Sequence, residues 1–273
     1  MSDSNITFIG GGNMTRSLVG GLVAAGIPNR TISVSEPQSE LRNNLQKDFG
    51  INVHADNISA ATGARVIVLA VKPQILQEVV VPLGSLVTEH QVLLVSIAAG
   101  ITAPSIERWT GGRPALVRVM PNTPALVGAG ISALYANANV DGDQRKLAQT
   151  IMSAVGKTVW IEDESLMDTV TAVSGSGPAY FFYVMQAIKD AAVAEGLDTG
   201  TARLLALETA LGAARLAAGS AEDPGTLQKR VTSPGGTTEA AINVLDSYGV
   251  SKTFHDAVSA ARTRGGELAK QLD

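Results

Sequence analysis

Cysteine is absent from this chain of 273 residues. The sequence therefore cannot form disulfides, thiolate metal sites or a cysteine nucleophile. Its three histidines, His54, His90 and His255, lie far apart and follow no metal-ligand spacing. We therefore expect no metal site, because side chains that bind a metal usually recur at short, regular intervals.

Basic clusters and aromatic residues are scarce. The formal net charge is −4, aromatic residues make up 4% of the chain, and no run of lysine or arginine occurs. Proteins that bind nucleic acid need a cationic surface and often aromatic side chains on which bases stack. We therefore expect no nucleic-acid partner.

Long apolar runs are missing as well. The longest stretches, such as residues 92–97, are far shorter than the roughly 20 apolar residues that span a membrane. The first apolar strand begins at about Ile6, too early for a secretory signal peptide. These features predict a soluble, cytoplasmic protein that does not enter a membrane.

Small and apolar residues, by contrast, are abundant. Hydrophobic residues make up 45% of the chain, which also holds 28 glycines. This supply is ample for a core, and a chain of this length favours two modest domains over one large domain.

A glycine turn near the start of the chain organises the first domain. The apolar strand Ile6–Ile9 runs into Gly10–Gly12 and then into a helix start. Such a turn brings the backbone close to a pyrophosphate, which binds to the free amides at the helix N-terminus. A helix over residues 18–26 and a strand over 31–34 complete a βαβ unit. The pattern predicts a nucleotide cofactor, although a plain turn without a ligand can have the same sequence.

The residues after the second strand concern the choice of nucleotide. In this kind of fold an acid at that strand end binds the ribose hydroxyls of NAD, whereas a small residue followed by a base admits the 2′-phosphate of NADP. Here Ser35 is followed by Glu36. The pair fits neither rule fully, and an exposed Glu36 without a ligand is an equal alternative.

Further strands and helices alternate up to about Glu164. The predicted strands are 51–53, 65–71, 92–98, 116–120, 131–135 and 158–161, and the predicted helices are 41–49 and 144–155. Lys72 and Ala98 come at the carboxyl ends of two strands, where ligands of open α/β sheets gather. We predict an α/β fold whose residues 1–164 form a Rossmann-type, mostly parallel sheet.

The remaining residues, 165–273, show no strand pattern. They predict helices over 177–195, 201–218, 237–246 and 251–269, with faces rich in alanine. A small helical domain with so few large apolar side chains usually recruits a second copy. We predict an all-α C-terminal domain that binds substrate and forms a homodimer.

Two glycine-rich stretches in the second half need an explanation. Residues 174–180 read SGSGPAY and residues 232–238 read TSPGGTT, and each precedes a predicted helix. Free amides and hydroxyl groups at a helix start can hold a small carboxylate. The alternative is that each stretch is only an N-cap with a turn.

Together these motifs resemble the pyrroline-5-carboxylate reductase family. The resemblance is carried by SGSGPAY at 174–180, SPGGTT at 233–238, AVKP at 70–73 and MPNTP at 120–124, and it extends over nearly the whole chain. It implies a Rossmann domain followed by a helical dimerisation domain with interlocked helices. It also implies a homodimer, in some members a decamer built as a pentamer of dimers, and NADPH or NADH as the hydride donor.

The resemblance also implies site residues. Matched position by position, the family's cofactor contacts correspond to Gly10, Gly11, Gly12, Asn13, Met14, Thr15, Ser35, Pro37, Asn57, Ala70, Val71, Lys72, Pro73 and Ala98. Its substrate contacts correspond to Glu164, Ser233, Gly236, Thr237 and Thr238. Thr15 departs from the glycine that usually occupies its place in the turn.

The implied reaction is hydride transfer to the C=N bond of 1-pyrroline-5-carboxylate, which gives L-proline in the last step of proline biosynthesis. We expect the substrate carboxylate on the amides of Gly236, Thr237 and Thr238. A protonated imine accepts hydride more readily, so Glu164 or the hydroxyl of Thr238 or Ser176 could hold or supply that proton. The sequence does not decide among these catalytic candidates, between NADPH and NADH, or whether proline inhibits the enzyme.

Two other functions compete with this interpretation. A reductase of the β-hydroxyacid dehydrogenase kind needs a lysine early on the first long helix after the domain boundary, where only Lys189 occurs, well down the helix. A non-enzymatic nucleotide-binding Rossmann protein would leave the two glycine-rich stretches unexplained.

Overall fold

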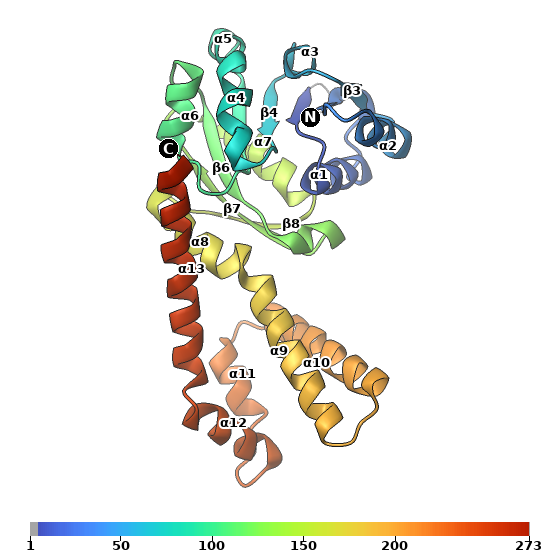
Figure 1. Cartoon of the computed structure of the whole chain (residues 1–273), viewed down its shortest axis with the longest axis vertical. Coiled ribbons are helices and arrows are strands. Elements are labelled where there is room, and N and C mark those ends of the chain that lie inside the picture. Colours follow the sequence, from blue (N-terminus) through green and yellow to red (C-terminus); the bar gives the residue numbers. More distant parts are fainter. Residues whose placement is uncertain (1–4, 273) are drawn as a thin grey trace. The chain divides into compact units, whose positions relative to one another are not determined.

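The computed structural model of this chain describes residues 5–272, and Figure 1 gives the course of the chain. The chain divides into two compact units. The first, here called the sheet unit, runs to Ser176 and includes the chain from Ala261 onward; the second, the helical unit, is Gly177–Ala260. The sequence-based boundary at residue 164 stays a prediction. The units divide later than that position, and the side-chain amide of Asn122 ties Ser174 O to the sheet unit at 3.2 Å.

One sheet of eight strands forms the centre of the sheet unit, in the order β3-β2-β1-β4-β5-β6-β7-β8. The strands are β1 Ile6–Ile9, β2 Ile32–Ser35, β3 Asn52–His54, β4 Val66–Leu69, β5 Leu93–Ser96, β6 Leu116–Met120, β7 Gly130–Ala136 and β8 Gly156–Trp160. Every neighbouring pair is parallel except β6 and β7. The predicted α/β class with a mostly parallel Rossmann-type sheet is confirmed.

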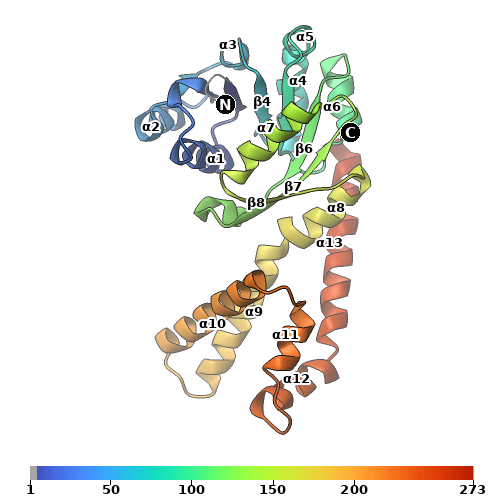
Figure 2. The same ribbon diagram turned by 180° about the vertical axis from the view of Figure 1, so that it is seen from behind.

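The central strands are continuous apolar runs because helices cover both faces of the sheet. In β4, Val66 and Val68 point into one core, while Ile67 and Leu69 point into a second. The first core lies under α1 and α7 and the second under α4–α6, as Figures 1 and 2 show from opposite sides. Strands that are buried on both faces carry apolar side chains on both sides, so apolar and polar residues do not alternate along them.

The helices of the sheet unit are mostly short. They are α1 Asn13–Ala24, α2 Ser39–Phe49, α3 Asn57–Ala61, α4 Leu76–Val80, α5 Gly84–Glu89, α6 Ala103–Thr110, α7 Gly142–Ser153 and α8 Met167–Val170. The sequence analysis missed α3–α6. Each spans eight residues or fewer, which is too short for a helical period to stand out.

The helical unit contains α9 Gly177–Ala194, α10 Thr199–Gly219, α11 Pro224–Arg230, α12 Thr237–Ser247 and the start of α13 Val250–Leu272. The sequence analysis predicted all of these except α11. Helix α10 begins two residues earlier than predicted, because the Asp198 carboxylate accepts hydrogen bonds from the amides of Gly200 and Thr201, both at 3.0 Å. Within residues 5–272, none of the helices combines the length and the apolar character needed to cross a bilayer.

Candidate functional site

The glycine turn after β1 joins the ends of three neighbouring strands. Gly10 donates its amide to Ser35 O at 2.8 Å, and its φ of +101° is strained for any residue with a side chain. A β-carbon at Gly10 would also lie 2.8 Å from Ala70 O. The backbone at this turn therefore lies too close to the ends of β2 and β4 to leave room for a side chain at Gly10.

Helix α1 leaves its first amides available for an anion. Its N-cap residue is Gly12, no side chain caps it, and its first turn contains no acid. The buried Thr15 donates its hydroxyl to Gly10 O at 2.6 Å, so the threonine in place of the usual third glycine closes the turn with a hydrogen bond. A helix start of this kind suits a phosphate group.

A cavity of about 530 Å³ opens beside this turn, where β1, β2 and β4 end. Nine of the predicted cofactor residues line it: Gly10, Gly11, Gly12, Ser35, Pro37, Asn57, Ala70, Val71 and Lys72. The glycine turn, the free helix start and the lysine fit a nucleotide diphosphate. The residues present therefore suit the cofactor that the sequence predicts.

The other five predicted cofactor residues do not line this cavity. Asn13 borders a separate cavity with Arg16 and Phe49, and Met14 packs against the core. Thr15 acts within the turn, Pro73 begins a short 3-10 turn, and Ala98 is buried beyond β5. Their contacts with a cofactor stay predictions.

Glu36 is not the exposed acid that the sequence allowed. The residue is only 6% exposed, and its carboxylate accepts hydrogen bonds from the amides of Gly11 and Gln38, both at 2.9 Å. The sequence analysis also missed Asp56, which lines the same cavity and caps α3 through Ser59. The amide of Ser59 holds the pKa of Asp56 below its usual value. The Asp-x-x-Ser pattern before α3 was the available signal.

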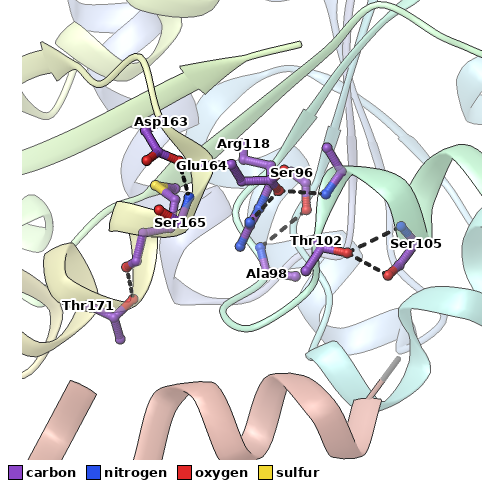
Figure 3. A network of polar contacts seen from close by, with 11 residues as sticks. Ser96, Ala98, Thr102, Ser105, Arg118, Asp163, Glu164, Ser165 and Thr171 are labelled. Atoms are coloured by element: carbon purple, nitrogen blue, oxygen red, sulfur yellow. Dashed lines mark hydrogen bonds and ion pairs between the residues drawn. The ribbon is translucent and has the colours of Figure 1, made fainter. Parts of the chain in front are cut away.

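Glu164, predicted to bind substrate, lines another cavity of the sheet unit. Figure 3 shows its polar contacts. Its Oε1 accepts hydrogen bonds from Arg118 Nη1 at 2.5 Å and from the Ala103 amide at 2.7 Å. The cavity measures about 340 Å³ and is lined by Gly100, Thr102, Pro104, Arg118, Glu164, Ser165, Met167, Asp168 and Ala269. In this arrangement Glu164 serves as a hydrogen-bond acceptor, tied to β6 and to the start of α6.

Arg118 was missed, although the sequence carried a signal. It is the one charge within the apolar strand β6, and it is 7% exposed.

The pKa values of two groups near Glu164 are also shifted. Burial, with the negative charges of Glu164 and Glu107, raises the pKa of Tyr135. The Ser165 amide lowers the pKa of Asp163.

The glycine-rich stretch at 174–180 leads into α9 at Gly177 as predicted, but helical backbone also precedes it. Thr171–Gly175 forms a π-helical turn between α8 and α9, and Ser176 donates its amide to Thr171 O at 2.8 Å. The interpretation as an anion cradle is wrong here, because helical hydrogen bonds already use the Ser176 amide. The catalytic role of the Ser176 hydroxyl stays a prediction.

The stretch at 232–238 also precedes a helix. Helix α12 begins at Thr237, and no side chain caps it. Gly236 already donates its amide to Ser233 O at 3.0 Å, and Gly235 donates to Glu239 Oε2 at 2.8 Å. The amides at the start of α12 that could bind an anion are therefore those of Thr237 and Thr238, and not that of Gly236. Substrate contacts at this loop stay predictions.

Two family models match the chain. Residues 5–100 match the model described as NADP oxidoreductase, coenzyme F420-dependent. Residues 164–268 match the model for pyrroline-5-carboxylate reductase dimerisation. A nicotinamide cofactor and a homo-oligomer follow from these matches.

Relatives of known name cover the whole chain. A pyrroline-5-carboxylate reductase of Pseudomonas aeruginosa is 49% identical over 100% of this chain and 99% of its own. The chain belongs to the pyrroline-5-carboxylate reductase family. A family member from Pisum sativum is 37% identical and covers 98% of both chains.

Solved structures of the family agree. A pyrroline-5-carboxylate reductase from Coxiella burnetii has a TM-score of 0.94 at 44% identity and covers 99% of this chain and 98% of its own. The Plasmodium falciparum enzyme, solved with NADP bound, has a TM-score of 0.86 at 30% identity and covers 98% and 99%. An imine reductase of Streptomyces aurantiacus, at 17% identity and a TM-score of 0.57, shares the fold alone.

Proposed function

We propose that this chain reduces 1-pyrroline-5-carboxylate to L-proline, as the last step of proline biosynthesis. The observation that carries the proposal is the 49% identity, over the full length of both chains, to a reductase of that name. When bound, NADPH or NADH supplies the hydride that reaches the imine carbon. The ring nitrogen takes up a proton, and the C=N bond becomes a single bond.

The cavity beside the glycine turn would hold the cofactor. The amides at the start of α1 would bind the diphosphate, and Lys72 at the end of β4 would add a positive charge. The name of the matched model and the NADP bound to the Plasmodium falciparum relative support a nicotinamide nucleotide. Either NADPH or NADH would serve as the hydride donor.

The substrate carboxylate would bind the amides of Thr237 and Thr238 at the start of α12, where the helix dipole favours an anion. Glu164 accepts hydrogen bonds from Arg118 and Ala103, so we assign it the role of a negative charge that favours the protonated imine. The hydroxyl of Thr238 or Ser176 would then supply or hold the proton. Positioning of this kind can account for on the order of 7 kcal/mol of the acceleration.

A homodimer in the cytoplasm completes the proposal. The family model that matches residues 164–268 is named for dimerisation. The decamer, as a pentamer of dimers, is a further assembly that a mass measurement would reveal. Neither of the competing functions, a β-hydroxyacid dehydrogenase or a non-enzymatic nucleotide-binding protein, has support from the named relatives.

The direct test follows the loss of NADPH or NADH absorbance with 1-pyrroline-5-carboxylate. We expect turnover with this substrate and none with short hydroxyacids or aldehydes. Cofactor binding without turnover would overturn the proposed activity.

Thr238→Ala should raise the KM for the pyrroline or lower kcat by about tenfold or more, as expected for losing one positioned hydroxyl. The Kd of NADPH or NADH should not change. Thr253→Ala, on the exposed surface of α13, is the matched control and should leave all constants unchanged. Wild-type kinetics in Thr238→Ala would remove Thr238 from the site.

A further inference from the structure

We propose that Glu36 selects against the 2′-phosphate of NADPH, so that this chain binds NADH in preference. The inference rests on the proposed function only in taking a nicotinamide dinucleotide as the ligand. It concerns the end of the cofactor cavity formed by β2 and β3.

Glu36 is held in a fixed position. It follows β2 directly, and its amide donates to His54 O at 3.0 Å. Its Oε2 accepts from Gly11 within the glycine turn, and its Oε1 accepts from Gln38, each at 2.9 Å. Two amides that donate to one carboxylate, one to each oxygen, fix its orientation.

The glycine turn is built to fit this carboxylate. A β-carbon at Gly11 would lie 2.9 Å from Glu36 Cβ and 3.0 Å from Glu36 Cγ. Any larger residue at Gly11 would displace the glutamate stem. The acid therefore lies directly against the segment that binds the cofactor diphosphate, in the position where dinucleotide-binding folds bind the adenosine ribose.

Charges along the cavity are distributed unevenly. Its ionisable lining residues are Glu36, Asp56 and Lys72. The two acids follow β2 and β3, whereas Lys72 follows β4, which lies on the other side of β1. The Ser59 amide lowers the pKa of Asp56, which keeps this second acid charged. A ribose bound at the β2 end therefore meets negative charge.

Arg42 lies in α2, after Glu36 in the chain, and its guanidinium donates hydrogen bonds to the backbone. Its Nη1 donates to Glu36 O and to Pro37 O, both at 2.7 Å, and the residue is not part of the cavity wall. A ribose 2′-hydroxyl can donate a hydrogen bond to the Glu36 carboxylate. A 2′-phosphate adds negative charge there and cannot donate.

The first experiment measures binding of the adenosine half alone. Isothermal titration calorimetry compares ADP with its 2′-phosphorylated counterpart, in the full-length protein and without pyrroline. We expect ADP to bind at least about tenfold more tightly, the order expected for one like-charge contact near a surface. The ratio should fall at high salt, which screens the repulsion. Equal or tighter binding of the 2′-phosphorylated ligand would overturn the proposal.

Variants then assign the effect to Glu36. Glu36→Gln removes the charge and keeps one acceptor, and Glu36→Ser leaves room for a phosphate. Each substitution should lower the ratio of the two Kd values by about tenfold. The Kd values of NADH and NADPH, measured by fluorescence, should change in the same direction. An unchanged ratio in a variant with a wild-type circular dichroism spectrum would reject Glu36 as the determinant.

Two control variants separate the alternatives. Glu40→Gln removes the same charge from an exposed position in the first turn of α2 and should leave the ratio unchanged. Arg42→Met should not raise the Kd of the 2′-phosphorylated ligand. If the Kd rises, Arg42 binds the phosphate and the proposal fails. None of these measurements needs reductase activity, so their outcome does not depend on whether the proposed reaction is correct.

Discussion

At the scale of single residues, Arg118 and Glu164 form a largely buried ion pair in the sheet unit. The side chains are 8% and 21% exposed, and Glu164 also accepts the first amide of α6. Breaking a buried pair leaves a charge without compensation, which costs more than the pair contributes. Arg118 therefore acts as a positioning residue for Glu164.

Arg118→Met should lower the free energy of unfolding by about 3 kcal/mol and raise the KM for pyrroline-5-carboxylate, with little change in the Kd of the dinucleotide. Arg118→Lys should restore part of the substrate affinity, since it restores the charge but not the shape of the guanidinium. Urea unfolding and steady-state kinetics measure these effects.

Arg145→Met is the control for the previous substitution. Arg145 pairs with Glu162 at 2.9 Å on the surface and lies over the ring of Trp160. Its loss should cost about 1 kcal/mol or less and leave the KM unchanged. If Arg118→Met lowers stability but neither KM nor kcat changes, Arg118 has a structural role only.

At the scale of elements, the π-helical turn Thr171–Gly175 connects α8 to α9 and is hydrogen-bonded to Asn122 of the MPNTP segment. The Asn122 side chain links this turn to β7: Nδ2 donates to Ser174 O at 3.2 Å, and Oδ1 accepts from the Ile131 amide at 3.0 Å. π-Turns are uncommon and frequently occur at functional sites. This turn places Ser176, one of the two hydroxyl candidates for proton transfer.

Asn122→Asp keeps the acceptor for Ile131 but replaces the donor with an oxygen that faces the Ser174 carbonyl. We expect a loss of about 1–2 kcal/mol in stability and a lower kcat. Asn139→Asp is the matched control, because Asn139 Nδ2 also donates to a carbonyl, Arg113 O, at 3.2 Å on the surface. Equal effects of the two substitutions on kcat would rule out a special role for the π-turn.

At the scale of the whole molecule, the helical unit lacks a core of its own. Between Gly177 and Ala260 the buried apolar residues are Ala202 and Ala206. Large side chains of α9 and α10 are exposed instead, among them Phe182 at 63% and Leu204 at 61%. Since a domain of this size needs buried apolar area to fold stably, a second chain must supply it.

Phe182→Asp should convert the oligomer to smaller species and lower its stability, because a charge replaces a large apolar side chain in the interface. Light scattering coupled to size exclusion reports the mass. Ile58→Asp, at a residue of the sheet unit that is 44% exposed, is the control and should leave the mass unchanged. A wild-type mass for Phe182→Asp would place the interface elsewhere.

The local patterns of the chain predicted all eight strands. Continuous apolar runs such as β4 are readable because every residue in them is buried, and the glycines of the first turn follow from backbone geometry at one place in the chain. The short helices α3–α6 were not readable, since a segment of five to eight residues contains too few turns to show a period.

The sequence by itself determined the fold class and the family, because these depend on local pattern and on motifs. Its motifs also predicted nine residues that line the cavity beside the glycine turn, whose contacts with a cofactor stay a prediction. Only the tertiary structure decided the environment of Glu36 and Glu164 and the exclusion of Gly236 and Ser176 as free amide donors. The two acids depend on partners 25 and 46 residues away, Gly11 for Glu36 and Arg118 for Glu164. The amides of Gly236 and Ser176 are used by local turns, to Ser233 O and Thr171 O, whose geometry the motifs do not specify. The role of a charged side chain depends on its hydrogen-bond donor or ion-pair partner, and only the folded chain brings such distant partners together.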